Sequence, residues 1–191
     1  VNKPAGWHST ERLLRQPKSH SDQEGQVQAG ERSMELWLRR HFEEVQQIEE
    51  AGLSMRLDQV TSGCLLIGRT SDARRRLLAS VKEGQVEKLY LAIVTGGSES
   101  SGTIALHFRN RYKRSKKISA FESGRPNERG VCSWKVLHNH HDPTSGLPPM
   151  SIVAVKLHGA GRRHQIRASM SSLGTPILGD SLYGGPQWDC P

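Results

Sequence analysis

Hydrophobic residues recur at helical spacing between residues 34 and 48. Apolar side chains occur there every three or four positions, which is typical of one face of an amphipathic helix: Met34, Trp37, Leu38, Phe42, Val45 and Ile48. Ser33 is suited to cap the start of this helix, and Gly52 is suited to end it. We therefore predict a helix that continues to Gly52 and places Trp37 and Phe42 in the core.

A second helix is predicted from Ser71 to Gly84. Ser71 and Asp72 are suited to cap its first turn, and Gly84 marks its end. Its predicted inner face consists of Ala73, Leu77, Leu78 and Val81. The arginines at positions 74–76 point outward, where they either face RNA or are simply solvated; the pattern leaves both alternatives open.

Three stretches have the pattern of strands. Residues 64–67 form a short apolar run that is typical of a buried strand, and residues 89–94 (LYLAIV) form a longer one. Residues 151–157 alternate and place three apolar side chains on one face: Val153, Val155 and Leu157. A loop over residues 158–163 then leads to a third predicted helix, which carries Ile166, Met170 and Leu173 and stops at Gly174.

The other segments show little periodicity. Residues 1–10 look like the end of a strand that enters a Pro-Gly turn, and the polar residues 16–30 are predicted to form an exposed loop. Residues 98–150 contain Gly/Pro-rich stretches and the basic run 109–117 (RNRYKRSKK), so we expect an irregular basic insertion there. An exposed loop is also expected at the histidines 138, 140 and 141, rather than a metal site.

These elements predict an α+β fold around a mixed but largely antiparallel sheet with flanking helices, because the helices lie between strands that need not be sequential neighbours. The chain has 191 residues, of which 35% are hydrophobic, so a single domain over residues 1–191 is expected. The chain opens on Val1 rather than Met, and we therefore expect a fragment that is truncated at both ends.

Charge narrows the class of partner. The 27 Lys and Arg residues exceed the 19 Asp and Glu residues, giving a formal net charge of +8. This surplus favours a polyanionic partner, because each neutralised phosphate releases counterions; the simpler alternative is solubility alone. An aromatic residue within a basic run, as at 109–117, is a composition that binds phosphate backbones, although the signal is weak alone.

Cysteine content and hydropathy add little to this picture. The 3 cysteines are widely spaced and contain no C-x-x-C pair that would suggest a zinc site. Their odd number and wide spacing make a reducing intracellular compartment the simpler expectation. No apolar run approaches the roughly 18 residues that a transmembrane helix needs, so no membrane association is expected. Cytoplasmic, nuclear and organellar locations all stay open.

Polar residues interrupt the apolar pattern at a few places. Asp58 lies in a loop just before a predicted buried strand, and Arg56 would favour its charged form if the two side chains converge. The alternative is a loop aspartate that caps the turn at residues 61–63. Arg167 follows the apolar Ile166, so an inward guanidinium would need a carboxylate partner, for which both Asp58 and Asp180 are candidates.

Five ordered motifs together resemble the RluA family of pseudouridine synthases, which modify ribosomal and transfer RNA. They cover most of the chain and lie at residues 1–6 (VNKPAG), 56–63 (RLDQVTSG), 86–92 (VEKLYLA), 161–167 (GRRHQIR) and 173–184 (LGTPILGDSLYG). The resemblance implies the pseudouridine synthase fold, with a central RNA-binding cleft. It also implies site-specific isomerisation of uridine to pseudouridine after base flipping, with neither cofactor nor metal.

The resemblance also assigns roles to residues. Asp58 matches the nucleophilic aspartate, Tyr90 matches a tyrosine that packs on the target uracil and helps deprotonate C5, and Arg167 matches the arginine that pairs with the nucleophile. Arg56 matches an arginine that enters the space left by the flipped base, and Ile177 matches an apolar residue that lines the pocket.

Two further residues are assigned to RNA or base binding. They are Lys88, which shares a strand face with Tyr90, and Arg162, which lies in the fourth motif. The expected partner is a stem-loop of ribosomal or transfer RNA, bound by a monomer.

The chain departs from the family at three positions. Met55 stands where the family usually has His, Arg163 where it usually has Thr, and Ser169 where His is common. None of these changes removes a group assigned to the reaction, but they bear on substrate fit. Two other readings remain: a catalytically silent RNA-binding protein on the same fold, and a basic binding module that depends on residues 109–117.

Overall fold

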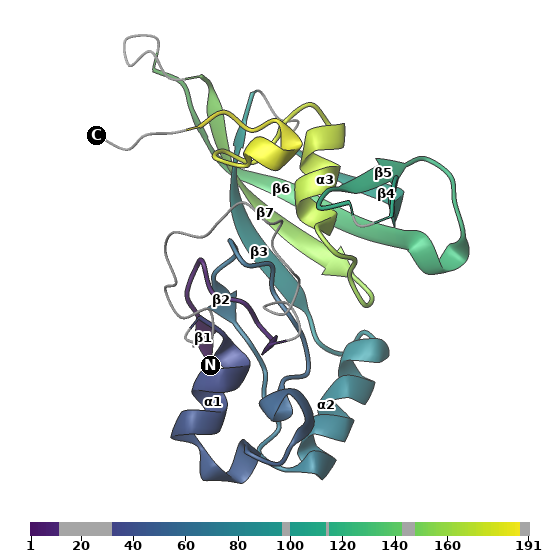
Figure 1. Cartoon of the computed structure of the whole chain (residues 1–191). Helices are drawn as coiled ribbons and strands as arrows, with labels where there is room; N and C mark the ends of the chain where they lie inside the picture. The colour runs from purple at the N-terminus through teal and green to yellow at the C-terminus, as the bar shows by residue number, and fades with distance from the viewer. Residues whose placement is uncertain (12–31, 97–99, 114, 143–147, 188–191) are drawn as a thin grey trace. The chain divides into compact units, whose positions relative to one another are not determined.

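A computed structural model describes residues 1–11, 32–96, 100–113, 115–142 and 148–187. The chain forms two compact units, Val1–Lys82 and Glu83–Pro191 (Figure 1). The predicted loop at residues 16–30 lies outside the described residues. The expectation of one domain over the whole chain stays a prediction.

The first unit contains a short two-stranded sheet and two helices. Strand β1 (Asn2–Lys3) pairs antiparallel with β2 (Gly63–Cys64). This confirms the strand that was predicted at the start of the chain. The predicted strand at 64–67 was too long: only Cys64 is in β2 and it is exposed, whereas Leu65 is buried. Within this run Leu65 is buried, whereas its neighbours Cys64 and Leu66 are exposed, so the run does not behave as a fully buried strand.

Helix α1 (Met34–His41) is shorter than predicted. Ser33 caps it as expected, since its Oγ accepts a hydrogen bond from the Leu36 amide at 3.5 Å. The helix ends because Phe42 adopts an extended backbone, and two 3-10 turns follow, η3 (Glu43–Val45) and η4 (Glu49–Gly52). These turns keep Val45 and Ile48 buried at the three-residue spacing that had predicted a continuous helix.

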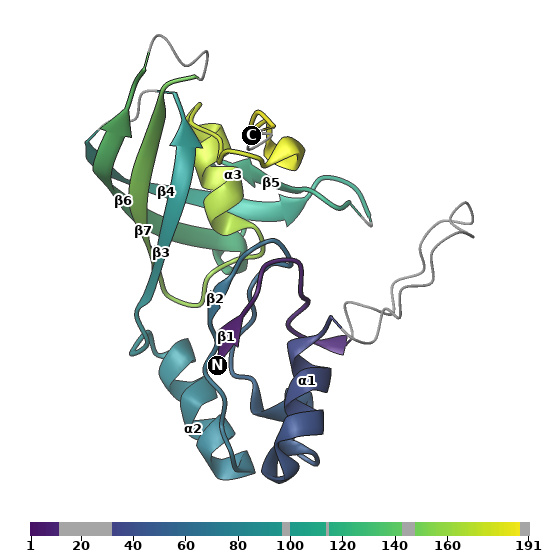
Figure 2. The same ribbon diagram turned by 90° about the vertical axis from the view of Figure 1, so that its left-hand side faces the viewer.

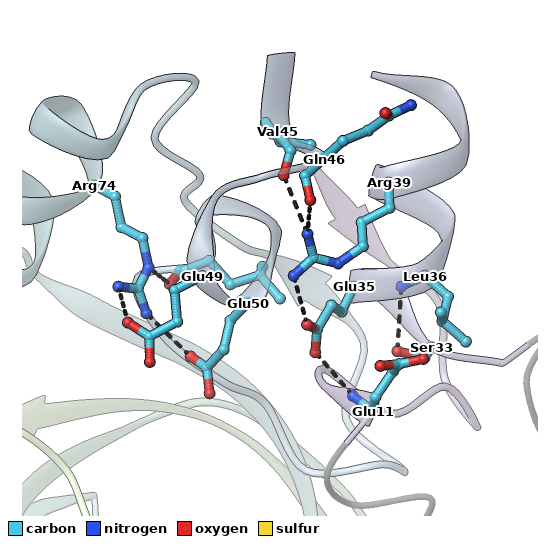
Figure 3. A network of polar contacts seen from close by, with 11 residues as sticks. Glu11, Ser33, Glu35, Leu36, Arg39, Val45, Gln46, Glu49, Glu50 and Arg74 are labelled. Carbon is cyan, nitrogen blue, oxygen red and sulfur yellow. Dashed lines mark hydrogen bonds and ion pairs between the residues drawn. The ribbon is translucent and has the colours of Figure 1, made fainter. Parts of the chain in front are cut away.

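Arg39 supports the turn that replaces the last part of the predicted helix. Its guanidinium donates to the carbonyls of Val45 and Gln46 and forms an ion pair with Glu35 (Figure 3). Trp37 and Phe42 are only half-buried, so their prediction as core residues was wrong in degree. Trp37 instead stacks on His41, with ring centroids 4.4 Å apart.

Helix α2 (Ser71–Lys82) has the predicted position, but its cap and its burial differ. The hydroxyl of Thr70, one residue earlier than expected, accepts the Ala73 amide at 3.1 Å. No described residue of this helix is fully buried, and Leu78 of the predicted inner face is 38% exposed. The helix therefore packs more loosely than its pattern indicated.

The second unit is built on a five-stranded sheet in the order β3-β7-β6-β4-β5, in which all neighbours are antiparallel (Figure 2). The strands are β3 (Lys88–Thr95), β4 (Ser101–Asn110), β5 (Ile118–Phe121), β6 (Arg129–His140) and β7 (Met150–His158). Strands β3 and β7 confirm the two strands predicted around 89–94 and 151–157. The predicted α+β class with a largely antiparallel sheet is confirmed.

The expectation of an irregular insertion at 98–150 was wrong, because strands β4, β5 and β6 lie in that segment. The buried positions of β4 and β6 do alternate, but polar residues such as Ser133 dilute the pattern. A glycine also hides it: Gly102 pairs with Trp134, whose ring fills the space that a Cβ at Gly102 would need. His138 and His140 lie at the end of β6 and not in a loop, although both are exposed.

Helix α3 (Gln165–Ser172) confirms the third predicted helix and ends before Gly174, whose φ is +74°. Its Met170 packs into a cluster with residues of β3, β6 and β7, and its Ala168 packs into a second cluster with β4 and β5. The 3-10 turn η6 (Ser181–Tyr183) follows. Among the described residues, no helix is long and apolar enough to cross a membrane.

Candidate active site

The loop that carries Asp58 is held on its N-terminal side by Ser9. The fully buried hydroxyl of Ser9 donates to the Leu57 carbonyl and accepts from the Leu57 amide, both at 3.0 Å. One side chain thus fixes both main-chain groups of the residue before Asp58. Asp58 itself is half-buried, and its carbonyl accepts the Thr61 amide at 3.1 Å in the turn that follows.

Lys3 holds the same loop on its C-terminal side. Its side chain is completely buried, and Nζ donates to the carbonyls of Pro4, Trp7 and Gln59 at 3.0, 2.7 and 3.1 Å. The Gln59 carbonyl also accepts the Gly6 amide at 2.8 Å. The motif at residues 1–6 therefore acts as a support for the residue after Asp58.

The charges around this loop explain how a lysine can be buried there. Burial lowers the pKa of Lys3, and the negative charge of Asp58 opposes that shift. Burial and the positive charge of Lys3 also lower the pKa of His8. Arg56, which would favour the charged form of Asp58 if the two side chains converged, is exposed, and Met55 is half-buried. Neither Lys3 nor Ser9 was singled out from the sequence, because the partners that join them to the loop with Asp58, Gln59 and Leu57, lie 56 and 48 residues away.

Lys88 and Tyr90 lie on β3, opposite Leu157 and Val155 of β7. Lys88 is 8% exposed, and its Nζ donates to the carbonyls of Gly159 and Ala160 at 2.8 and 2.9 Å. Burial lowers the pKa of Lys88. The side chain therefore holds the turn between β7 and α3, and its assignment to RNA binding stays a prediction.

Tyr90 and Ile177 both pack at the edge of one apolar cluster, which is centred on Val94, Val153 and Val155. Ile177 also bridges to Val94 of β3. Both residues are half-buried. The second unit thus brings the predicted uracil-packing tyrosine and the predicted pocket residue to the same part of its core.

Arg167 is on α3 and forms an ion pair with Asp180. Its Nε and Nη2 donate to Oδ2 and Oδ1 of Asp180, each at 2.7 Å, in the bidentate geometry that gives arginine–carboxylate pairs their specificity. Both side chains are largely buried. Asp180, one of the two carboxylates predicted as partners, is therefore confirmed as a partner of Arg167. A pairing of Arg167 with Asp58 would join residues of the two units and stays a prediction.

Tyr183 connects Arg167 to strand β5. The Arg167 guanidinium carbon lies 4.9 Å from the centroid of the Tyr183 ring, within the range of a cation–π contact. The Tyr183 hydroxyl donates to the Ile118 carbonyl and accepts the Ile118 amide, both at 2.9 Å, and it lies 2.9 Å from His164 Nδ1. Since the phenol has one proton, Nδ1 of His164 must be the donor in the third contact.

The loop before α3 has its own support. The Arg162 amide donates to Gln165 Oε1 at 2.8 Å, and Arg162 Nε donates to the Arg129 carbonyl at 2.9 Å. Arg163 is exposed and donates from Nη2 to the Lys116 carbonyl at 3.0 Å. Arg163, which replaces the usual threonine, therefore joins this loop to the segment between β4 and β5.

Ser169, which stands where histidine is common, is fully buried on α3. It hydrogen-bonds to Cys132, whose pKa burial raises and this hydrogen bond partly lowers. Among the described residues, no three His, Cys, Asp or Glu side chains are grouped so that they could hold a metal ion.

The family model of RNA pseudouridylate synthases matches residues 1–172. Ribosomal large subunit pseudouridine synthase D of Pseudomonas aeruginosa is 32% identical over 145 residues, which are 76% of this chain and 42% of that protein. An uncharacterized RNA pseudouridine synthase of Zymomonas mobilis is 37% identical over 133 residues, which are 68% of this chain and 56% of that protein. The chain thus spans about half or less of the length of these curated relatives.

Two solved human structures are similar to the chain. Human RNA pseudouridylate synthase domain containing 1 matches with a TM-score of 0.60 and 32% identity, over 69% of this chain and 54% of that one. Human RNA pseudouridylate synthase domain containing 4 matches with a TM-score of 0.66 and 21% identity, over 100% of this chain and 69% of that one, a likeness that supports the fold. Because the family model matches residues 1–172, which are most of this chain, the chain belongs to the RluA family of RNA pseudouridylate synthases.

Proposed function

We propose that the protein isomerises uridine to pseudouridine in structured ribosomal or transfer RNA, with Asp58 as the nucleophile and without a cofactor. Family membership supports the reaction class, and the relatives named above are pseudouridine synthases by name. The observation that carries the assignment to Asp58 is the double support of its loop. Leu57 is fixed by Ser9 and Gln59 by Lys3, so the carboxylate between them is held on a rigid main chain.

The reaction breaks the bond between N1 and C1′ of uridine, turns the detached uracil and joins C5 to C1′. The C5 proton is lost and N1 gains a proton, so the product is an isomer of uridine. The carboxylate of Asp58 either captures the sugar or base covalently or removes a sugar proton. In this proposal Tyr90 packs on the uracil and helps to remove the C5 proton. The target base must leave its stack before these groups can reach it, and Arg56 enters the space that it leaves.

Arg167 is suited to an electrostatic role in this reaction. Asp180 binds Nε and Nη2 and so fixes the plane of the guanidinium, while Tyr183 lies beside it. An arginine that is oriented before substrate binds loses little free energy to reorganisation during the reaction. We assign it the pairing with the nucleophile that the family resemblance predicts.

Replacement of Asp58 by Asn tests the proposal. Asp58→Asn keeps the size of the side chain but removes the nucleophilic charge, so we expect pseudouridine formation to be lost while RNA affinity persists. The readout is release of the uridine C5 hydrogen from labelled RNA, together with a map of pseudouridines in RNA that is exposed to each protein.

The matched control is Asp72→Asn, which makes the same chemical change at the exposed first turn of α2. This variant should retain activity. Unchanged turnover by Asp58→Asn would overturn the proposal, and RNA binding without product from the unaltered protein would favour a catalytically silent RNA-binding protein instead.

A further inference from the structure

Two basic segments of the chain differ in whether carboxylates neutralise them. On α2, Arg74 forms ion pairs with Glu49 and Glu50 (Figure 3). It also donates to the Leu53 carbonyl at 3.1 Å. The two following arginines, at positions 75 and 76, are exposed, but both form ion pairs with Asp72. The arginine run of α2 is therefore largely compensated within its own unit.

The basic residues between β4 and β5 are not compensated in this way. We define the hairpin surface as the exposed cations of this connection together with Arg163: Arg111, Lys113, Lys116, Lys117 and Arg163. Within the described ranges none of the five forms an ion pair. Arg114 lies outside the described residues and is not included.

Contacts hold the hairpin surface together and place it beside Arg167. The bond from Arg163 Nη2 to the Lys116 carbonyl joins the loop before α3 to the connection between β4 and β5. Lys117 Nζ lies 5.0 Å from the centroid of the Tyr183 ring, and the Arg167 guanidinium lies 4.9 Å from the same centroid. Uncompensated positive charge therefore extends up to the arginine that is assigned to the reaction.

One aromatic side chain within this surface is strongly exposed. Tyr112, between Arg111 and Lys113, is 71% exposed. Exposed aromatic rings beside cations are the combination by which proteins bind single-stranded nucleic acid, because the ring stacks on a base while the cations contact phosphates. A protein partner with an acidic surface would not need the exposed ring.

We propose that the hairpin surface binds the phosphate backbone of the RNA next to the target uridine, with Tyr112 stacked on an unpaired base. This inference rests on the proposed function, since it names the surface by which the same RNA is held. Arg163 replaces a residue that is usually threonine in the family, so this chain has one more cation at this surface than the family pattern predicts.

Charge removal on the two basic segments tests the inference. The first variant replaces Arg111, Lys113 and Lys116 with Gln, and the matched control replaces Arg75, Arg76 and Lys82 of α2 with Gln. Both lose three exposed positive charges. The probe is a fluorescent RNA hairpin with uridines in its loop, and its dissociation constant is measured at several salt concentrations.

We expect the hairpin variant to bind this RNA about 100-fold more weakly near 0.15 M salt and to lower the slope of log affinity against log salt by about two to three, as the loss of three phosphate contacts requires. The α2 control should stay within about threefold of the unaltered protein, because two of its three cations, Arg75 and Arg76, are already paired with Asp72. Tyr112→Ala should weaken binding about tenfold and leave the salt slope unchanged, because stacking involves no counterion.

Equal losses in the hairpin variant and the α2 control would overturn the inference, because they would show a general effect of net charge. Affinity unchanged in the hairpin variant would also overturn it. These outcomes are separate from those for the proposed function, which is judged by product formation in Asp58→Asn. Circular dichroism of each variant shows whether it is folded, and the exposed positions of all substituted residues favour normal folding.

Discussion

Two buried lysines, one in each unit, both donate hydrogen bonds to main-chain carbonyls, but they differ in the number of acceptors and in the charge nearby. Lys3 is completely buried and donates to three carbonyls, whereas Lys88 is 8% exposed and donates to two. Burial lowers the pKa of both, but a nearby carboxylate, that of Asp58, opposes the shift only at Lys3.

The number of acceptors decides what each lysine needs. An ammonium group has three N–H donors and a neutral amine has two. Lys88 can therefore lose its proton and still satisfy the carbonyls of Gly159 and Ala160, whereas Lys3 needs its charge to satisfy all three of its acceptors. Lys3 is therefore matched to the charge of Asp58 in the loop that it supports, whereas Lys88 supports a turn.

The largest effect is expected from Lys3→Met. The carbonyls of Pro4, Trp7 and Gln59 lose their hydrogen bond from Lys3, so we expect the free energy of unfolding to fall by about 3 kcal/mol or more. Pseudouridine formation should also fall at temperatures where the variant is still folded, because the carbonyl of Gln59, next to Asp58, then keeps only its bond from the Gly6 amide. Urea unfolding and the C5-hydrogen release assay measure the two effects. The control is Lys82→Met at an exposed site in the same unit, and wild-type activity in folded Lys3→Met would remove Lys3 from the support of the site.

Lys88→Met should have a smaller effect on stability. Two carbonyls lose their donor, and we expect a loss of about 2 kcal/mol in the free energy of unfolding. Lys135→Met, an exposed substitution on β6, serves as the reference in the same urea experiment. A loss equal to or larger than that of Lys3→Met would show that the number of carbonyl acceptors does not decide how much each lysine stabilises the protein.

The smallest effect is in the pH dependence of stability. The ordinary lysine pKa is 10.5, and that of Lys88 is lowered in the folded state, so the unfolded chain binds more protons in the window below 10.5. Stability therefore rises with pH in that window, and the advantage of the unaltered protein over Lys88→Met should grow between neutral pH and about pH 10.

The corresponding growth relative to Lys3→Met should be smaller, because the charge of Asp58 opposes the shift at Lys3. Urea midpoints at a series of pH values between neutral and about pH 10 measure both differences, and titrating groups that do not interact with either lysine cancel between protein and variant. A larger growth for Lys3 than for Lys88 would show that the carboxylate has little influence on the lysine.

Much of the fold was predictable where one residue pattern persists over a whole element. Strand β7 was found because three successive inward positions are apolar, and α3 was found because Ile166 and Met170 have helical spacing. Strand β4 was missed because residues such as His107 occupy partly buried positions within it. The end of α1 was missed because 3-10 turns preserve a spacing of three residues between apolar side chains.

The candidate site was predictable only in the residues that motifs name. The sequence indicated Asp58, Tyr90 and Arg167, and it offered Asp180 as a partner for Arg167, which the structure confirms. Lys3 and Ser9 could not be identified as supports, because their role depends on hydrogen bonds to residues 56 and 48 positions away. No local pattern reports such a bond.

Those hydrogen bonds between distant residues also affect the order in which parts of the first unit fold. The contact between Lys3 and Gln59 spans 56 positions of the chain, and the pairing of β1 with β2 closes the same stretch. Closing so long a loop costs conformational entropy before its bonds repay it, whereas α1 and α2 depend on neighbours in sequence. During folding we therefore expect the loop with Asp58 to acquire its final shape after the helices of its unit, so the carboxylate becomes fixed only when the two ends of that stretch have met.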